Sequence, residues 1–205
     1  MESVGFKEWA VVCEAMGRGR QSIILRKGGV AEGGQGFAFK HREFFLFPTW
    51  FHEQPQKVRW ETGTELPAKP SRPNRGAETA AGDNGDTGSV AIRYAVRLES
   101  WHTVVEWDVV EALEPFHVLQ PEVVRERFQY DDAPGIHVGV VRVYRLDPVW
   151  SFPGKARYRG CRSWVELPDV PNHTGLAPVL TDQEHNTAVA QVTRALAQGT
   201  PSTAP

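Results

Sequence analysis

The residues best suited to chemistry in this chain are two cations and two glycines at the end of a short apolar run. Arg26 and Lys27 directly follow the run 23–25 and precede Gly28 and Gly29. Paired glycines let backbone N–H groups approach a ligand closely, and the two cations supply positive charge. This combination predicts an anion-binding loop. The nucleotide-binding pattern G-x-x-x-x-G-K-S/T is absent, and a hairpin loop with exposed cations is the alternative.

Two histidines bracket a second apolar run, F-F-L-F-P-T. His41 lies before this run and His52 after it, and Thr49 directly follows the proline. Imidazole suits a general base near neutral pH and is a common metal ligand. No third ligand stands at a metal-binding spacing, so we expect no metal ion and no other cofactor. Histidines that form hydrogen bonds at strand ends, and a threonine that caps a turn, are the plainer alternatives.

A third segment, K-A-R-Y-R-G-C-R-S-W at residues 155–164, interleaves cations with aromatic residues. This composition is used for contact with a nucleic-acid backbone combined with base stacking. Arginine also favours bidentate contact with phosphate. We therefore expect Arg159 and Arg162 to contact a backbone, and Trp164 or Trp50 to stack on a base.

Two other functions remain open. Cys161 lies among cations, which lower the pKa of a thiol, so a hydrolase could use Cys161 or a metal with His41 or His52 as its base. No G-x-S-x-G or comparable nucleophile context occurs, so we assign no catalytic residue. A protein-interaction domain with exposed tryptophans is the third hypothesis.

Composition places the chain among ordinary globular proteins, with 40% hydrophobic residues and a net charge of −2. This charge argues against binding a polyanion through the bulk field. The charges are segregated, however, since residues 15–31 and 155–162 hold cations and no acid, while 99–114 hold acids and no Lys or Arg. With no bilayer-spanning run and no signal peptide, we expect a cytoplasmic protein with no membrane partner and free thiols at Cys13 and Cys161.

Hydrophobic periodicity predicts helices that interleave with strands, and hence an α+β fold with a mixed, curled or barrel-like sheet and several flanking helices. A strand from Val90 would place Ile92, Tyr94, Val96 and Leu98 on one face. The stretch W-A-V-V-C allows a strand as the alternative to the first helix. We expect helices at 4–16, 104–113, 121–128 and 182–198, and strands at 21–26, 37–47, 90–98, 136–146 and 164–167.

The segment 61–89 is rich in proline and glycine and has one large apolar residue, so it predicts a disordered insertion. It interrupts a single domain, 1–168. Residues 169–205 form an extension that carries the last helix, at about 182–198, and a frayed tail.

The R-K-G-G and F-P-T-x-x-H segments are predicted to form one site, with the segment 157–164 as its third wall. If 21–26 and 37–47 paired as a simple hairpin, about 17 Å of strand would separate the two segments. A shared site therefore requires that the two strands do not pair, as in a curled sheet.

Four sequence boxes together resemble a bacterial family, domain of unknown function 1802. They are K-E-W-A, L-R-K-G-G-V, F-x-F-P-T-x-x-H and G-C-R-S-W-V-E-L, and the resemblance spans Phe6 to Leu167 apart from the insertion. Some members are joined to a restriction-endonuclease-like domain, which implies a DNA-associated accessory role. None of the lysines here follows an Asp or Glu by two positions, so the D/E-x-K half of that nuclease site is missing.

The leading hypothesis is a nucleic-acid-binding or phosphate-recognising accessory module, associated with DNA restriction or defence. Its partners would be DNA or RNA and a separate nuclease subunit.

Overall fold

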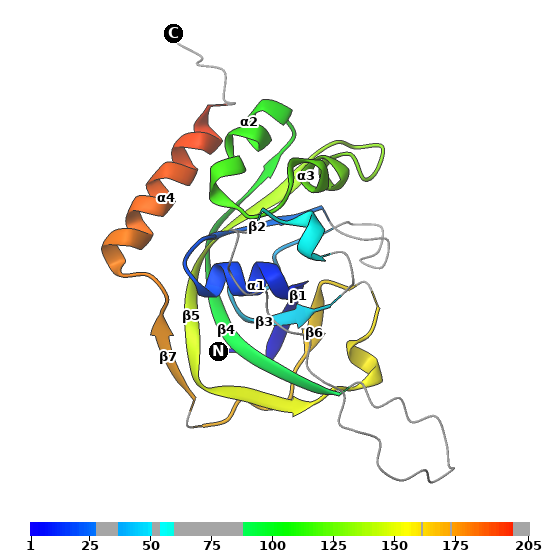
Figure 1. The fold of residues 1–205 in the computed structure, drawn as a ribbon, viewed down its shortest axis with the longest axis vertical. Helices are drawn as coiled ribbons and strands as arrows, with labels where there is room; N and C mark the ends of the chain where they lie inside the picture. The colour runs from blue at the N-terminus through cyan, green and yellow to red at the C-terminus, as the bar shows by residue number, and fades with distance from the viewer. Residues whose placement is uncertain (28–36, 51–53, 60–87, 161, 173, 199–205) are drawn as a thin grey trace.

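Two long antiparallel strands determine the shape of the sheet. β4 (Ser89–Val104) and β5 (Ile136–Pro153) pair along most of their length, and Figure 1 shows both strands curving around α1 (Ala10–Gly17). The computed structural model describes residues 1–27, 37–50, 54–59, 88–160, 162–172 and 174–198.

Within these residues the strands form one mixed, open, seven-stranded sheet in the order β2-β5-β4-β3-β1-β6, with β7 also paired to β5. β1 and β3 run parallel, and every other neighbouring pair is antiparallel. The predicted α+β class with a mixed, curled sheet is thus confirmed. The shorter strands are β1 (Val4–Trp9), β2 (Ile23–Arg26), β3 (Glu43–Thr49), β6 (Trp164–Glu166) and β7 (Gly175–Pro178).

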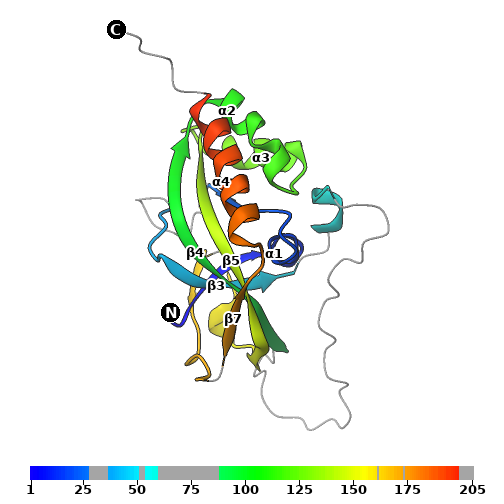
Figure 2. The ribbon, with the colours of Figure 1, turned by 90° about the vertical axis from the view of Figure 1, so that its left-hand side faces the viewer.

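The other helices lie at one end and along one side of the curled sheet. α2 (Trp107–Ala112) and α3 (Pro121–Phe128) cover the end of the sheet at the top of Figure 1, and α4 (Asp182–Ala197) runs alongside β5 and packs against α2 (Figures 1 and 2). None of the helices in the described part of the chain is long and apolar enough to cross a membrane. Short 3-10 turns lie at Gln54–Lys57, Glu114–Phe116 and Ala156–Tyr158.

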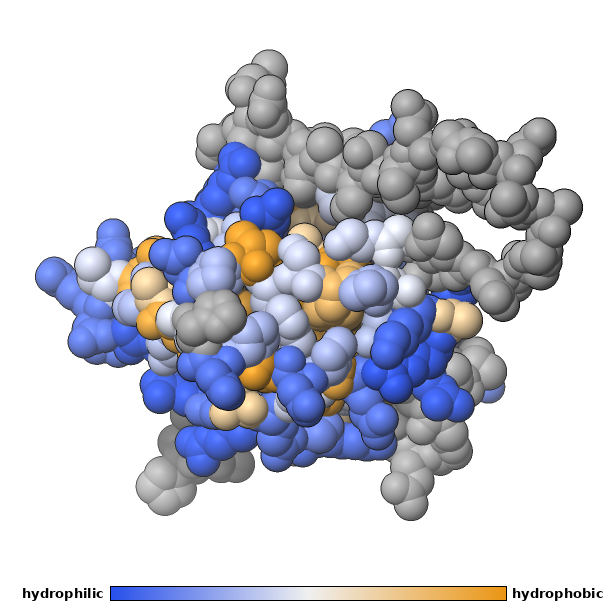
Figure 3. Space-filling model, turned by 90° about the horizontal axis from the view of Figure 1, so that it is seen from below, coloured by the Kyte–Doolittle hydropathy of each residue, from blue (hydrophilic) through white to orange (hydrophobic). Residues whose placement is uncertain are grey.

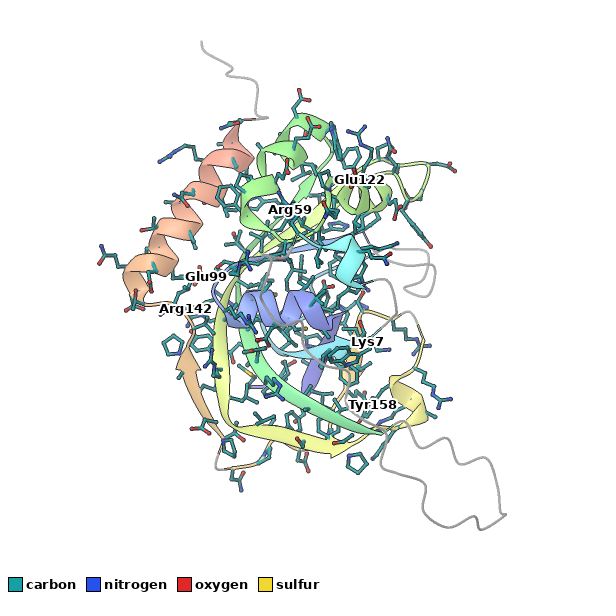
Figure 4. The ribbon with its side chains drawn as sticks, in the orientation of Figure 1. Lys7, Arg59, Glu99, Glu122, Arg142 and Tyr158 are labelled. Carbon is teal, nitrogen blue, oxygen red and sulfur yellow. The ribbon has the colours of Figure 1, made fainter. Side chains whose placement is uncertain are left out.

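A capping box and ion pairs to β4 and β5 hold the N-terminus of α4 in place. The Thr181 hydroxyl accepts a hydrogen bond from Glu184 N, and the Glu184 side chain accepts one from Thr181 N, which is a capping box. His185 Nε2 lies 2.9 Å from Glu99 Oε2 on β4, and Asp182 forms an ion pair with Arg142 on β5. Glu99 and Arg142 both lie beside α4 in Figure 4.

The apolar run of β3 is buried on both faces of the sheet. Phe44 and Leu46 belong to the larger hydrophobic cluster, which includes α1, while Phe45 and Phe47 belong to a smaller cluster. This division follows from the alternation of side chains along a strand. Seen from below, hydrophobic residues reach the surface in small patches among hydrophilic ones (Figure 3).

The N-terminal segment differs from the predicted helix at 4–16. Val4–Trp9 is a strand, β1, and the helix begins only at Ala10. The backbone of this strand pairs with β3 on one side and β6 on the other. Sheet pairing on both edges therefore overrides the helical spacing of the apolar residues in the sequence.

The segments 21–26 and 37–47 do not pair as a simple hairpin, and a shared site requires that they do not. β2 pairs with β5, whereas β3 begins at Glu43 and pairs with β1 and β4. Pro48 lies within β3, opposite Glu8, and its lack of an N–H is tolerated because the pairing with β4 ends at Phe45.

Pairing between β4 and β5 extends further than predicted. β4 continues to Val104, so the expected helix at 104–113 begins at Trp107. A register shift between Ile92 and Tyr94 marks a bulge, and Ile92 accordingly joins the smaller cluster instead of sharing a face with Tyr94. The helix at 121–128 is confirmed as α3, and the last helix as α4.

The domain division stays a prediction. Most of the expected insertion, residues 60–87, lies outside the described residues, and the residues beyond 168 contribute β7 and α4, which pack against β5.

Candidate anion-binding site

Glu8 and Arg127 form a buried ion pair between β1 and α3. Glu8 is only 2% exposed, and its Oε1 lies 3.8 Å from Arg127 Nη2. The same carboxylate oxygen accepts a hydrogen bond from Trp9 N at 2.7 Å. Arg127 Nη1 donates to Leu25 O at 2.7 Å, and its guanidinium lies 4.8 Å from the centre of the Trp9 ring. This pair brings β1, β2 and α3 together at one point.

Arg26 adds a second positive charge at this point. Its guanidinium lies over the Phe6 ring, and its Nε donates a hydrogen bond to Ser163 Oγ at 3.0 Å. In the described part of the chain, the other two guanidinium nitrogens of Arg26 have no hydrogen-bond or ion-pair partner. The arginine pair, Arg26 and Arg127, is therefore balanced by one carboxylate.

Burial and charge act together on the arginine pair. Burial, the largest effect, lowers the pKa of Arg127, and the nearby charge of Arg26 lowers it further, while Glu8 acts in the opposite direction. A buried charge without sufficient compensation is unfavourable, and a bound anion at Arg26 would offset this cost. The arrangement is thus suited to bind a phosphate or carboxylate group.

Lys7 lies on the other side of β1. Successive side chains of a strand point to opposite faces, so Lys7 faces away from Glu8. Lys7 is 5% exposed, and its Nζ donates to Gly160 O at 2.9 Å, while its backbone N donates to Ser163 O. It thereby fixes the segment that carries Ser163 against β1 (Figure 4).

The structure brings two of the three predicted walls together at β1. Arg26 contacts Ser163 of the segment 157–164, and Thr49 Oγ1 donates to Glu8 O at 3.0 Å. Gly28, Gly29 and His52 lie outside the described residues, so a single site formed by both sequence boxes stays a prediction.

Arg159 and Arg162 are exposed, and neither side chain forms an ion pair within the described residues. They lie close in sequence to Ser163, the hydrogen-bond partner of Arg26. Lys27, in contrast, is engaged: its Nζ lies 3.0 Å from Asp131 Oδ1 and donates to Ala133 O.

His41 and Trp164 contact each other, and in the described part of the chain neither makes a hydrogen bond or ion pair with Arg26 or Arg127. His41 Nδ1 lies 2.6 Å from Glu2 Oε2, and its ring centre is 4.9 Å from that of Trp164. The Trp164 ring also packs against Phe6 and Phe44, and its Nε1 donates to Ala38 O. These contacts give Trp164 a packing role and occupy much of its ring.

Two of the residues that the hydrolase hypothesis uses lie outside the part of the chain that the structure describes. These are His52 and Cys161, and no group of three metal-binding side chains occurs within the described residues. Cys13 is buried, and burial in particular raises the pKa of its thiol, which disfavours the reactive thiolate.

Sequence reasoning missed Glu8 and Arg127. One signal was available for Arg127, because it lies between buried Val124 and buried Phe128 on the apolar stripe of α3. A charged residue at such a position indicates a buried partner. Nothing in the sequence identified Glu8 as that partner, since the two residues are far apart along the chain.

Comparison with known proteins gives a family. A family model described as "Domain of unknown function (DUF1802)" matches residues 5–191, which confirms the resemblance drawn from the sequence boxes. No curated protein is a significant match. Among solved structures, an ASCH protein from Zymomonas mobilis is 10% identical, covers 91% of this chain and 93% of its own, and has a TM-score of 0.37. A Tyr-to-Phe mutant of that protein is 11% identical, covers 93% of this chain and 98% of its own, and has a TM-score of 0.40. At these scores the likeness supports no inference about function.

Proposed function

We propose that this chain, which belongs to the DUF1802 family, is a phosphate-recognising accessory module that binds nucleic acid. The observation that carries the proposal is the arginine pair. Arg127 is paired with Glu8, whereas Arg26 has no carboxylate partner and two guanidinium nitrogens without a protein partner in the described part of the chain.

A phosphate group fits this arrangement chemically. A guanidinium whose two Nη nitrogens are free makes charge-assisted hydrogen bonds to phosphate oxygens, each worth about 1.5–3 kcal/mol. Because Ser163 holds the Nε edge of Arg26 in place, little side-chain entropy would be lost on binding.

A nucleic-acid backbone fits better than a single small anion, because further cations lie close in sequence. Arg159 and Arg162 are exposed near Ser163, so successive phosphates of one strand would meet successive cations. The family resemblance implies a DNA-associated accessory role, and we propose that it is exercised in the cytoplasm beside a separate nuclease subunit.

Binding of fluorescently labelled DNA and RNA, measured by anisotropy at two salt concentrations, tests this function. We expect Arg26→Ala and Arg162→Ala each to weaken binding about tenfold and to make the salt dependence shallower by about one ion. Arg93→Ala, which removes an exposed arginine from β4, is the matched control and should bind like the wild type.

Wild-type protein that binds neither DNA nor RNA at low salt would refute the proposal. Equal losses for Arg26→Ala and Arg93→Ala would refute the assigned site. The free energy of unfolding of each variant, measured in urea, separates lost contacts from lost folding, and Arg162→Ala serves as the second variant because its side chain is exposed.

A further inference from the structure

Trp101 is a large aromatic side chain exposed on β4, with 51% of its surface accessible. Its ring centre lies 6.3 Å from that of His137 and 6.5 Å from that of Phe39. Phe39 in turn packs edge-on against Phe37 at 4.8 Å, and Phe37 lies 5.5 Å from His137. These four residues form a continuous aromatic strip whose exposed end is Trp101.

The aromatic strip lies on the same face of the sheet as Arg26. In the β2–β5 pairing Arg26 lies opposite His137, and in the β4–β5 pairing Trp101 lies opposite Gly139. Residues directly opposite in a pair share a face, and so do residues two apart along a strand. Arg26, His137 and Trp101 therefore occupy one face of three neighbouring strands.

Gly139 makes room for the strip. A Cβ atom at this position would lie 2.6 Å from the Phe39 ring, so glycine leaves the space that this ring occupies beside β5. Lys40, the next residue, is exposed. Arg26, on the same face, supplies positive charge beside the aromatic rings.

We propose that Trp101, the exposed end of the aromatic strip, stacks on a base of a single-stranded nucleic acid whose backbone phosphates meet Arg26. The proposal rests on the proposed function and specifies its ligand. Aromatic platforms beside cations bind single strands in this way, because every base has a face available for stacking. In a duplex those faces are covered by the neighbouring base pairs, so the strip should discriminate in favour of single strands.

The test compares a labelled single strand of about 15 nucleotides with its duplex, by anisotropy. We expect Trp101→Ala to weaken single-strand binding about tenfold, Trp101→Phe to retain most of it, and duplex binding to stay unchanged. The salt dependence should also stay unchanged, because no charge is lost. Leu176→Ala, which removes an exposed apolar side chain from β7, is the control.

The outcomes separate this proposal from the proposed function. If the wild type binds but Trp101→Ala changes nothing, or weakens single strand and duplex equally, stacking on Trp101 is refuted while phosphate recognition stands. If the wild type binds no nucleic acid, both fail. Trp101→Phe keeps an aromatic ring in place, so its partial or full retention of binding distinguishes stacking from a loss of folding.

Discussion

Arg26 Nε donates a hydrogen bond to Ser163 Oγ at 3.0 Å, and this contact joins the two ends of the sheet. β2, which ends at Arg26, is the first strand in the order, and β6, which begins just after Ser163, is the last. The sheet curls far enough for its edges to meet through side chains, although no backbone pairing closes it within the residues that the structure describes. Residues from distant parts of the sequence therefore meet at Arg26.

Ser163→Ala should lower the free energy of unfolding by about 1–2 kcal/mol. Ser163 is fully buried, and its hydroxyl is the acceptor for Arg26, so the alanine would leave Nε of a partly buried guanidinium without a partner. Urea unfolding measures the change. Ser151→Ala, at an exposed position on β5, is the control and should cost less than about 0.5 kcal/mol. Equal stability of the two variants would show that the contact contributes nothing.

The sequence was informative where local pattern and burial agree. Proline at the first position and the apolar stripe of α3 predicted that helix with its correct bounds, and the valine-rich run from Ile136 predicted β5 as far as Leu146. The F-F-L-F run indicated a buried strand. It did not identify the neighbours of that strand, because a run buried on both faces carries no signal for its partner.

The site was predictable only in part, for a related reason. Arg26 was proposed from the sequence because it stands in a local pattern with two glycines, and its binding role stays a prediction. Glu8 and Ser163 were missed because each contributes to the candidate site only through a contact with a residue that is distant in sequence. Trp101 was missed because the residue types around it predict an ordinary strand.

Gly17→Ala should destabilise the protein by about 1–3 kcal/mol through a clash with Tyr94. A Cβ atom at position 17 would lie 1.9 Å from Tyr94 Cζ, and the Tyr94 hydroxyl is held by a hydrogen bond to Glu14 Oε2 at 3.0 Å. Tyr94→Leu alone should cost stability too, but the double variant should lose less than the sum of the two changes. Additive losses, measured by urea unfolding, would contradict a clash between these residues.

Acidification should destabilise the protein through His117. Burial, followed by the charges of Arg59 and Arg127, lowers the pKa of His117 to about 3, and its Nδ1 accepts a hydrogen bond from Leu119 N at 3.2 Å. Between that value and the ordinary pKa of about 6.5, the unfolded chain binds a proton that the folded chain does not. Stability from this residue is therefore complete above about pH 6.5 and falls by up to about 1.4 kcal/mol per pH unit on acidification.

His117→Asn provides the measurement, because its amide oxygen can still accept from Leu119 N but does not titrate. The difference in unfolding free energy between the wild type and this variant should change steadily from pH 6.5 to 4.5. Parallel pH profiles would show that His117 does not titrate differently in the folded and unfolded states.

Glu8→Gln should destabilise the protein by about 3–5 kcal/mol, because it leaves the buried Arg127 without its counter-charge while preserving the acceptor for Trp9 N. If an anion binds at the arginine pair, phosphate becomes the only counter-charge in this variant. Added phosphate should then raise the melting temperature of Glu8→Gln more than that of the wild type, beyond the effect of sodium chloride at equal ionic strength. Glu166→Gln, at an exposed position on β6, is the control. If Glu8→Gln does not fold, the double variant Glu8→Gln/Arg127→Met should recover folding, since it removes both charges together. An equal response to phosphate in Glu8→Gln, Glu166→Gln and the wild type would show that no anion balances this pair.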